Sequence, residues 1–166
     1  MKIFIFGPSG AGKSTVARRI SKKLGVEHFD LDEIFWKFEK GELNLEKRNE
    51  TVGQILSHEK WLVEGMYSDP WVKEVIKSSD KIFAFVPGKF LNYWRILRRT
   101  MPRILKIKKH VRPSNFALIT YLFKIVKNFH IEKLPGFLDM AKDAKKEVFI
   151  VKSGNEIEDV LDMIDG

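Results

Sequence analysis

The chain has 166 residues, and 44% hydrophobic content is enough for the core of one domain, residues 1–166, which excludes a disordered chain. It has no cysteine, which excludes disulfides and thiolate sites, and no apolar run near the roughly 18 residues of a membrane span, so we expect a cytoplasmic protein with no membrane contact. The net charge of +8 favours an anionic partner, either a nucleotide or a nucleic acid.

Short apolar runs alternate with helical patterns along most of the chain. The run Ile3–Phe6 has no polar break, which predicts a strand buried on both faces, and Trp61–Val63, Ile82–Val86 and Val148–Val151 predict three more strands. Glu27–Asp30 is a further, short strand candidate. The helical patterns cover Ser14–Leu24, a segment opened by Asp69-Pro70, Phe90–Met101, Ser114–Phe129, Pro135–Ala144 and a last helix capped by Asn155. Strands separated by helices predict an α/β fold with a parallel sheet covered on both faces.

The first strand runs directly into the string Gly7-Pro8-Ser9-Gly10-Ala11-Gly12-Lys13-Ser14, which fits the phosphate-loop motif G-x-x-x-x-G-K-[ST]. The glycines let backbone N–H groups approach a phosphate, and the following helix adds the positive end of its dipole. We expect Lys13 to reach the β- and γ-phosphates as a catalytic residue and Ser14 to bind Mg²⁺. The predicted fold is therefore that of a P-loop NTPase with strand order 2-3-1-4-5, and the predicted ligands are ATP and Mg²⁺.

Acidic residues follow the second and third strands, and in parallel sheets ligands bind at the carboxyl ends of the strands. Asp30 and Asp32 could orient an acceptor hydroxyl or accept its proton, with Asp32 the catalytic candidate. The alternative is that Asp32 caps a helix beginning at Glu33. Glu64 could hold Mg²⁺ or contact the acceptor, or it could pair with a surface lysine, and Gly65 would let a ligand approach the backbone.

The segment Gly88–Leu134 holds twelve basic residues and one acidic residue, a charge of +11. Three arginines of its first helix, Arg95, Arg98 and Arg99, share one helical face, and Trp94, Leu97 and Met101 form the opposite, buried stripe. We expect this insertion, roughly residues 88–135, to form a helical lid over the phosphates, with Arg95 and Arg99 as catalytic candidates and Arg95 and Arg98 bound to ATP. The alternatives are a solvated basic face or a nucleic-acid surface.

The third strand ends in Glu64-Gly65, and the chain has no Asn-Lys-x-Asp guanine motif, a pattern typical of small-molecule and nucleotide kinases rather than GTPases. Four strings, at residues 28–36, 63–68, 93–99 and 112–113, resemble the adenylate-kinase-related DNA topology modulation proteins (FlaR-like). The resemblance implies a P-loop kinase fold, ATP binding and phosphotransfer, and it implies little about the acceptor.

We therefore expect an ATP- and Mg²⁺-dependent kinase, a phosphotransferase acting on a nucleoside, nucleotide or related metabolite. The alternative is a nucleotide-binding regulator of DNA that uses the basic segment 88–134. The expected ATP contacts are Gly7, Pro8, Ser9, Gly10, Ala11, Gly12, Lys13, Ser14, Thr15, Arg95 and Arg98. The expected acceptor contacts are Asp30, Asp32, Trp36, Glu64, Gly65 and Tyr67, and the expected metal ligands are Ser14 and Glu64. The four histidines lack the spacing of a transition-metal site.

Overall fold

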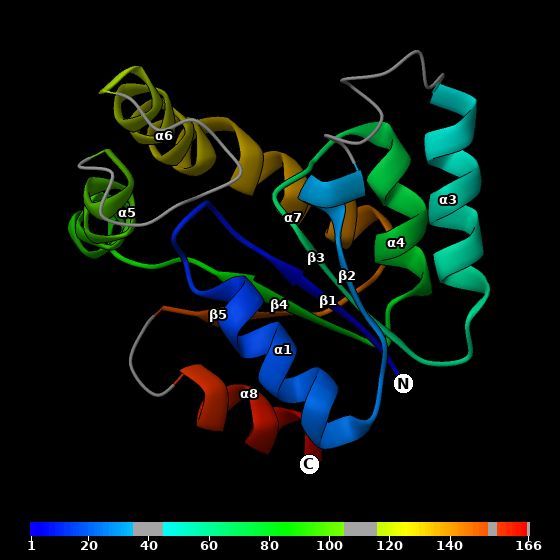
Figure 1. The fold of residues 1–166 in the computed structure, drawn as a ribbon. Coiled ribbons are helices and arrows are strands. Elements are labelled where there is room, and N and C mark those ends of the chain that lie inside the picture. The colour runs from blue at the N-terminus through cyan, green and yellow to red at the C-terminus, as the bar shows by residue number, and fades with distance from the viewer. Residues whose placement is uncertain (35–44, 105–115, 153–155, 166) are drawn as a thin grey trace.

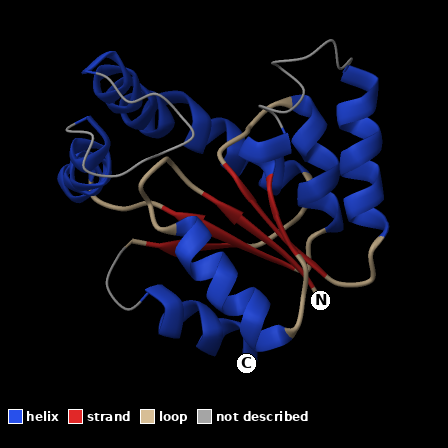
Figure 2. Ribbon diagram, in the orientation of Figure 1, coloured by secondary structure: helices blue, strands red, loops and turns tan. Residues whose placement is uncertain are grey.

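A computed structural model describes residues 1–34, 45–104, 116–152 and 156–165. Its strands are β1 (Lys2–Phe6), β2 (His28–Asp30), β3 (Trp61–Gly65), β4 (Lys81–Phe85) and β5 (Val148–Val151). They form one parallel sheet in the order β2-β3-β1-β4-β5, shown in Figures 1 and 2. The predicted fold class and strand order are therefore confirmed.

Helices cover both faces of this sheet (Figure 1). One face carries α1 (Lys13–Leu24) and α8 (Glu156–Asp165), and the other carries α3 (Leu45–Ser57), α4 (Lys73–Ser78) and α7 (Leu134–Asp143). The short 3₁₀ helix η1 (Pro70–Val72) leads into α4. Two further helices, α5 (Lys89–Ile104) and α6 (Phe116–Asn128), pack against each other beyond the carboxyl ends of the strands, in the connection between β4 and β5.

The central strand β1 is buried on both faces, because its side chains alternate between two hydrophobic cores. Phe4 and Phe6 enter the core beneath α4 and α7, where the ring of Phe6 stacks on that of Phe137 at 3.8 Å between centroids. Ile3 and Ile5 enter the core beneath α1 and α8. The uninterrupted apolar run of β1 thus fixes the strand that carries the phosphate loop at the centre of the molecule.

Two features of the helical layer differ from the sequence-based prediction. Helix α3 was not predicted, because only Val52 and Ile55 of its described side chains are fully buried and Gly53 lies between them, which leaves a weak apolar pattern. The predicted break between Phe129 and Pro135 is instead a π-helical turn, η2 (Phe129–Lys133), that joins α6 to α7 without interruption. Pro135 has no N–H for the regular helical ladder, and a π turn just before it accommodates that gap.

No helix in the described parts of the chain is long and apolar enough to cross a membrane.

Candidate active site at the phosphate loop

The phosphate loop has the backbone that its sequence requires. Gly10 and Gly12 have φ angles of +82° and +96°, a left-handed region that favours glycine. Gly12 is also the N-cap of α1 and makes no side-chain capping bond. The Thr15 N–H donates to the Gly12 carbonyl at 3.0 Å, so the N–H groups of Lys13 and Ser14 are the ones at this helix start that suit a ligand. The Gly7 N–H donates to the Gly65 carbonyl at 3.2 Å, which ties the start of the loop to the end of β3.

The two side chains that follow Gly12 point to opposite ends of the loop. Lys13 is buried, and its Nζ donates to the Pro8 carbonyl at 3.3 Å, so its ammonium crosses the loop. Ser14 is half-buried and faces β3, whereas Thr15 is exposed. Ser9 is half-buried, and the Ala11 N–H closes a turn onto the Pro8 carbonyl at 3.2 Å.

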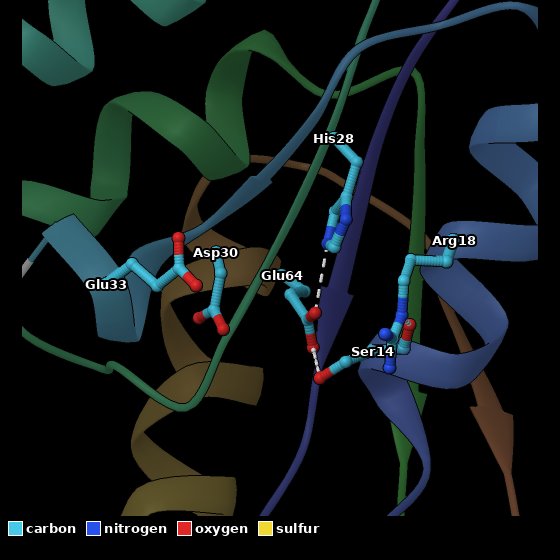
Figure 3. A pocket seen from close by; sticks show the side chains of 6 residues that line it. All are labelled: Ser14, Arg18, His28, Asp30, Glu33 and Glu64. Atoms are coloured by element: carbon cyan, nitrogen blue, oxygen red, sulfur yellow. Dashed lines mark hydrogen bonds and ion pairs between the residues drawn. The ribbon is translucent and has the colours of Figure 1, made fainter. Parts of the chain in front are cut away.

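Glu64 is the buried centre of the site (Figure 3). One of its carboxylate oxygens, Oε2, accepts a hydrogen bond from Ser14 Oγ at 3.0 Å, and the other, Oε1, accepts one from His28 Nε2 at 2.9 Å. These donors come from the first turn of α1 and the start of β2, on the same face of the sheet as Glu64. Glu64 thus lies at the end of the third strand beside the phosphate loop, and its described partners are Ser14 and His28 rather than the surface lysine of the alternative.

Asp30 pairs in register with Glu64 across β2 and β3, so both carboxylates lie on one face of the sheet. Burial, together with the nearby charges of Asp32 and Glu64, raises the pKa of Asp30 from 3.8 to about 6. Asp30 also accepts a hydrogen bond at Oδ1 from the Asp32 N–H at 2.8 Å, where a helical turn begins at Leu31. Asp30, and not Asp32, thus caps this turn, and the predicted cap at Asp32 is wrong.

These residues line an open pocket of about 370 Å³ beside the phosphate loop. Its lining residues are Ser14, Arg18, His28, Asp30, Glu33 and Glu64 (Figure 3). The half-buried Asp32 is outside this lining, although its charge reaches Asp30. The geometry therefore favours Asp30 over Asp32 as the carboxylate that faces a ligand in this pocket.

Of the remaining predicted acceptor residues, Gly65 ends β3 and Tyr67 follows it. A Cβ on Gly65 would meet the Leu31 Cβ at 2.9 Å, so packing against Leu31 already requires glycine there, whatever ligand approaches. Tyr67 is half-buried with its ring 5.2 Å from that of Trp71. Trp36 lies outside the described residues.

Helix α5 presents a different face to the loop from the one predicted. Trp94 is 50% exposed and Leu97 40% exposed, whereas Asn92 and Ile96 are fully buried, so the predicted buried stripe is wrong. Arg95 is half-buried and donates from Nη1 to the Ala11 carbonyl at 3.2 Å. Contact with the phosphate loop determines which face of α5 is buried. A prediction from hydrophobic periodicity therefore assigned the buried side to the wrong face.

Of the two other arginines that were predicted to face the phosphates, only Arg98 has a described side chain. Arg98 is exposed, with its guanidinium 5.2 Å from the Trp94 ring centroid. The side chain of Arg99, like that of Met101, lies outside the described part of the chain. Only Arg95, among the three predicted arginines, therefore has a described contact with the phosphate loop.

The donor set suits Mg²⁺ better than a transition metal. Ser14 and Glu64 offer hard oxygen ligands next to the space for phosphates, and Mg²⁺ in kinases is bound by few protein groups together with nucleotide phosphates. Among the described residues, no cluster of three or more histidine, aspartate or glutamate side chains could hold a metal by itself. The fit therefore supports a cation that arrives with a nucleotide.

Sequence reasoning missed four side chains near the site. Arg18 and His28 line the pocket, Asn92 faces the loop from α5, and Arg48 lies with its guanidinium 4.7 Å over the Trp71 ring. The contacts of His28, Asn92 and Arg48 are distant in the sequence, as in the 36 positions between His28 and Glu64, whereas Arg18 donates to the Ser14 carbonyl four positions earlier. The only local signal was the alternation of His28 with Asp30, which places both on one side of the second strand.

Comparison with known proteins identifies the family of the chain. The family model of shikimate kinase matches residues 9–93, half of the chain. The shikimate kinase of Colwellia psychrerythraea is 42% identical over 71 residues, which cover 37% of this chain and 41% of that protein. The shikimate kinase of Francisella tularensis subsp. novicida is 32% identical over 95 residues, covering 48% and 54%. This chain thus aligns with only about half the length of these relatives.

Solved structures agree over nearly the whole chain at the level of the fold. Shikimate kinase from Acinetobacter baumannii in complex with shikimate superposes with a TM-score of 0.63 at 20% identity, covering 98% of this chain and 89% of that one. Shikimate kinase from Bacteroides thetaiotaomicron gives a TM-score of 0.64 at 16% identity, covering 100% and 99%. These comparisons do not support the narrower resemblance to the DNA topology modulation proteins. The chain belongs to the shikimate kinase family.

Proposed function

We propose that this protein is a kinase that transfers the γ-phosphate of ATP, bound with Mg²⁺, to a hydroxyl group of a small molecule. The observation that carries the proposal is the position of Asp30. Its carboxylate lies in one pocket with Ser14 and Glu64, beside the phosphate loop, and its pKa is raised to about 6. A general base is most effective when its pKa lies near the working pH, so Asp30 suits proton abstraction from a hydroxyl.

The phosphate loop would bind and orient the donor. Its N–H groups and the N-terminus of α1 hold the phosphate oxygens, and Lys13 neutralises charge that develops on the β- and γ-phosphates. Ser14 and Glu64 would hold Mg²⁺, which when bound shields the phosphate charge during transfer. His28 keeps one oxygen of Glu64 in place, which leaves the other directed toward Ser14.

Asp30 would then activate the acceptor. The acceptor hydroxyl gives its proton to the Asp30 carboxylate, its oxygen bonds to the γ-phosphorus, and the bond from that phosphorus to the bridging oxygen breaks to release ADP. Asp30 is already held by the Asp32 N–H, so its carboxylate needs little reorganisation before the reaction.

Shikimate is the first acceptor to test, because the matched family and the aligned relatives carry its name. Shikimate is a hydroxylated ring with a carboxylate, and it needs a cation as well as a base. Arg48 lies over Trp71, whose ring also contacts Tyr67, and within the described residues the buried Arg48 Nε has no hydrogen-bond partner. Arg48 is therefore our candidate partner for the acceptor carboxylate.

The test is ADP release in the presence of MgATP and single acceptors. Shikimate is compared with a nucleoside, a nucleotide and a sugar, and Lys13→Ala is the inactive control. We expect release to require shikimate, and Arg48→Met to raise the KM for shikimate while the KM for ATP stays constant. Turnover only with a nucleoside or nucleotide would move the acceptor to the class that the sequence first predicted. No ADP release with any acceptor would remove the kinase proposal. The comparisons give the DNA-regulator alternative no support.

A further inference from the structure

The phosphate loop is supported from its carbonyl side by α5. Asn92, Arg95 and Ile96 occupy successive positions on one face of that helix. A Cβ on Gly10 would lie 2.7 Å from Asn92 Oδ1 and 2.9 Å from Ile96 Cγ1, so this face touches the loop directly. Arg95 donates to the Ala11 carbonyl. In a loop whose N–H groups face the phosphates, carbonyls face the other way, and α5 lies on that side.

Asn92 is anomalous on this face. Its side chain is 0% exposed, and within the described residues neither Nδ2 nor Oδ1 has a hydrogen-bond partner. A buried carboxamide without partners destabilises a folded protein, and such groups are rare. Leucine has nearly the same shape and would pack there without that penalty. A partner supplied by a change in the loop would explain why a polar residue occupies the position.

The turn at Ser9-Gly10 provides such a partner. The Ala11 N–H bonds to the Pro8 carbonyl, and Gly10 has a φ of +82°, which together define a type II turn. In this turn the Ser9 carbonyl lies on the side where a Cβ on Gly10 would project, and that is the side of Asn92. In the described structure Oδ1 lies on that side, and a half-turn of the carboxamide on nucleotide binding would exchange Oδ1 and Nδ2 and bring a donor toward the carbonyl.

We propose that Asn92 and Arg95 are positioning residues that hold the phosphate loop in its phosphate-binding form. Arg95 anchors the Ala11 carbonyl, and Asn92 Nδ2 bonds to the Ser9 carbonyl when the Gly10 N–H of the same peptide turns to a phosphate. The two ends of one peptide are then held by α5 and by the nucleotide. This inference rests on the proposed function only in requiring that the loop binds a nucleotide, and it is independent of the acceptor.

Isothermal titration of Asn92→Leu with ADP and AMP tests the proposal. We expect ADP to bind about 3- to 10-fold more weakly than to the wild type, the effect of one neutral hydrogen bond, and AMP affinity to stay unchanged because AMP lacks a β-phosphate. The free variant should melt about 2–4 °C above the wild type, because an unpartnered polar group has been removed. If Asn92 has no role in nucleotide binding, Asn92→Leu should raise the Tm and leave the ADP affinity unchanged.

Two further variants complete the experiment. Arg95→Met should weaken ADP binding about 10-fold or more, since a charged donor is lost, whereas Lys124→Met removes an exposed charge from α6 and should change nothing. If leucine prevents folding, Asn92→Ala takes its place with the same expected loss of ADP affinity. Unchanged ADP affinity in the Asn92 variants would overturn the proposal, whatever the Tm of the free protein. A wild type that binds no ADP would overturn the proposed nucleotide site itself.

Discussion

Asp30→Asn separates the electrostatics of the site from its architecture. The pKa of Asp30 is raised from 3.8 to about 6, so the folded protein binds this proton more tightly than the unfolded chain. Stability is therefore lost as the pH rises from about 4 to about 6, and the ionised group destabilises the protein at pH 8. The difference corresponds to about 3 kcal/mol at 1.36 kcal/mol per pKa unit. Solvent screening of this half-buried carboxylate reduces the effect to roughly 1–2 kcal/mol.

Asparagine removes the charge and keeps the capping oxygen, so the helical turn at Leu31 should survive. We expect Asp30→Asn to melt about 2–8 °C above the wild type at pH 8 and at the same temperature at pH 4. ADP release should fall by roughly 10²–10⁴-fold, the loss typical of a general base. Thermal melts at both pH values, with the exposed Asp139→Asn as the control, measure the first effect. An equal Tm at pH 8 would refute the electrostatic argument, and full turnover would move the base to Asp32 or Glu64.

Three other changes probe the same site. Lys13→Ala should leave the far-UV circular dichroism spectrum unchanged and abolish ADP release, because the ammonium that crosses the loop is lost; near-normal turnover would remove the P-loop kinase assignment. Gly65→Ala should lower the free energy of unfolding by roughly 1–3 kcal/mol, and with it the Tm, because its Cβ would meet Leu31. An unchanged Tm would show that the Leu31 side chain moves aside without cost. His28→Phe should raise the Mg²⁺ concentration for half-maximal activity about 3- to 10-fold, because Glu64 loses a hydrogen-bond partner. His28→Gln should restore part of the loss, and the control His58→Gln should have no effect. Equal Mg²⁺ requirements in His28→Phe and the wild type would exclude a role for His28 in holding Glu64.

The features predicted from sequence are those that local constraints determine. The phosphate loop needs positive φ at Gly10 and Gly12, a buried strand before it and a helix after it, and the sequence of residues 3–24 predicts all of these. Four of the five strands are short apolar runs between helical patterns, and that alternation predicts a parallel sheet; β2, with the sequence His28-Phe29-Asp30, is the exception. Ser14 and Glu64 were both predicted as metal ligands because they lie where neighbouring strands end, and the structure brings the two side chains into hydrogen-bond contact.

The features that sequence did not reveal depend on contacts between distant segments. Nothing near Asn92 marks it as buried, because its surroundings are Gly10 and the loop, 82 positions earlier in the chain. Hydrophobic periodicity instead assigned the buried face of α5 to Trp94 and Leu97, which are exposed. A helix that packs on a polar backbone buries its polar residues, and the usual apolar signal then indicates the wrong face.

The strand order explains why the site has two dissimilar sides. β1 carries the phosphate loop and lies between β3 and β4. On the β3 side, the adjacent strand ends bring Glu64 and Asp30 to the loop, and these are acidic groups suited to a cation and a proton. On the β4 side, the chain leaves the sheet directly into α5, which brings Asn92 and Arg95 to the loop. Arg95 donates to the Ala11 carbonyl, and Asn92 is the donor that we propose for the Ser9 carbonyl. The residues proposed to activate the acceptor and those proposed to position the loop therefore lie on opposite sides of one central strand. Variants on the β3 side should affect acceptor activation, and variants on the β4 side should affect nucleotide binding.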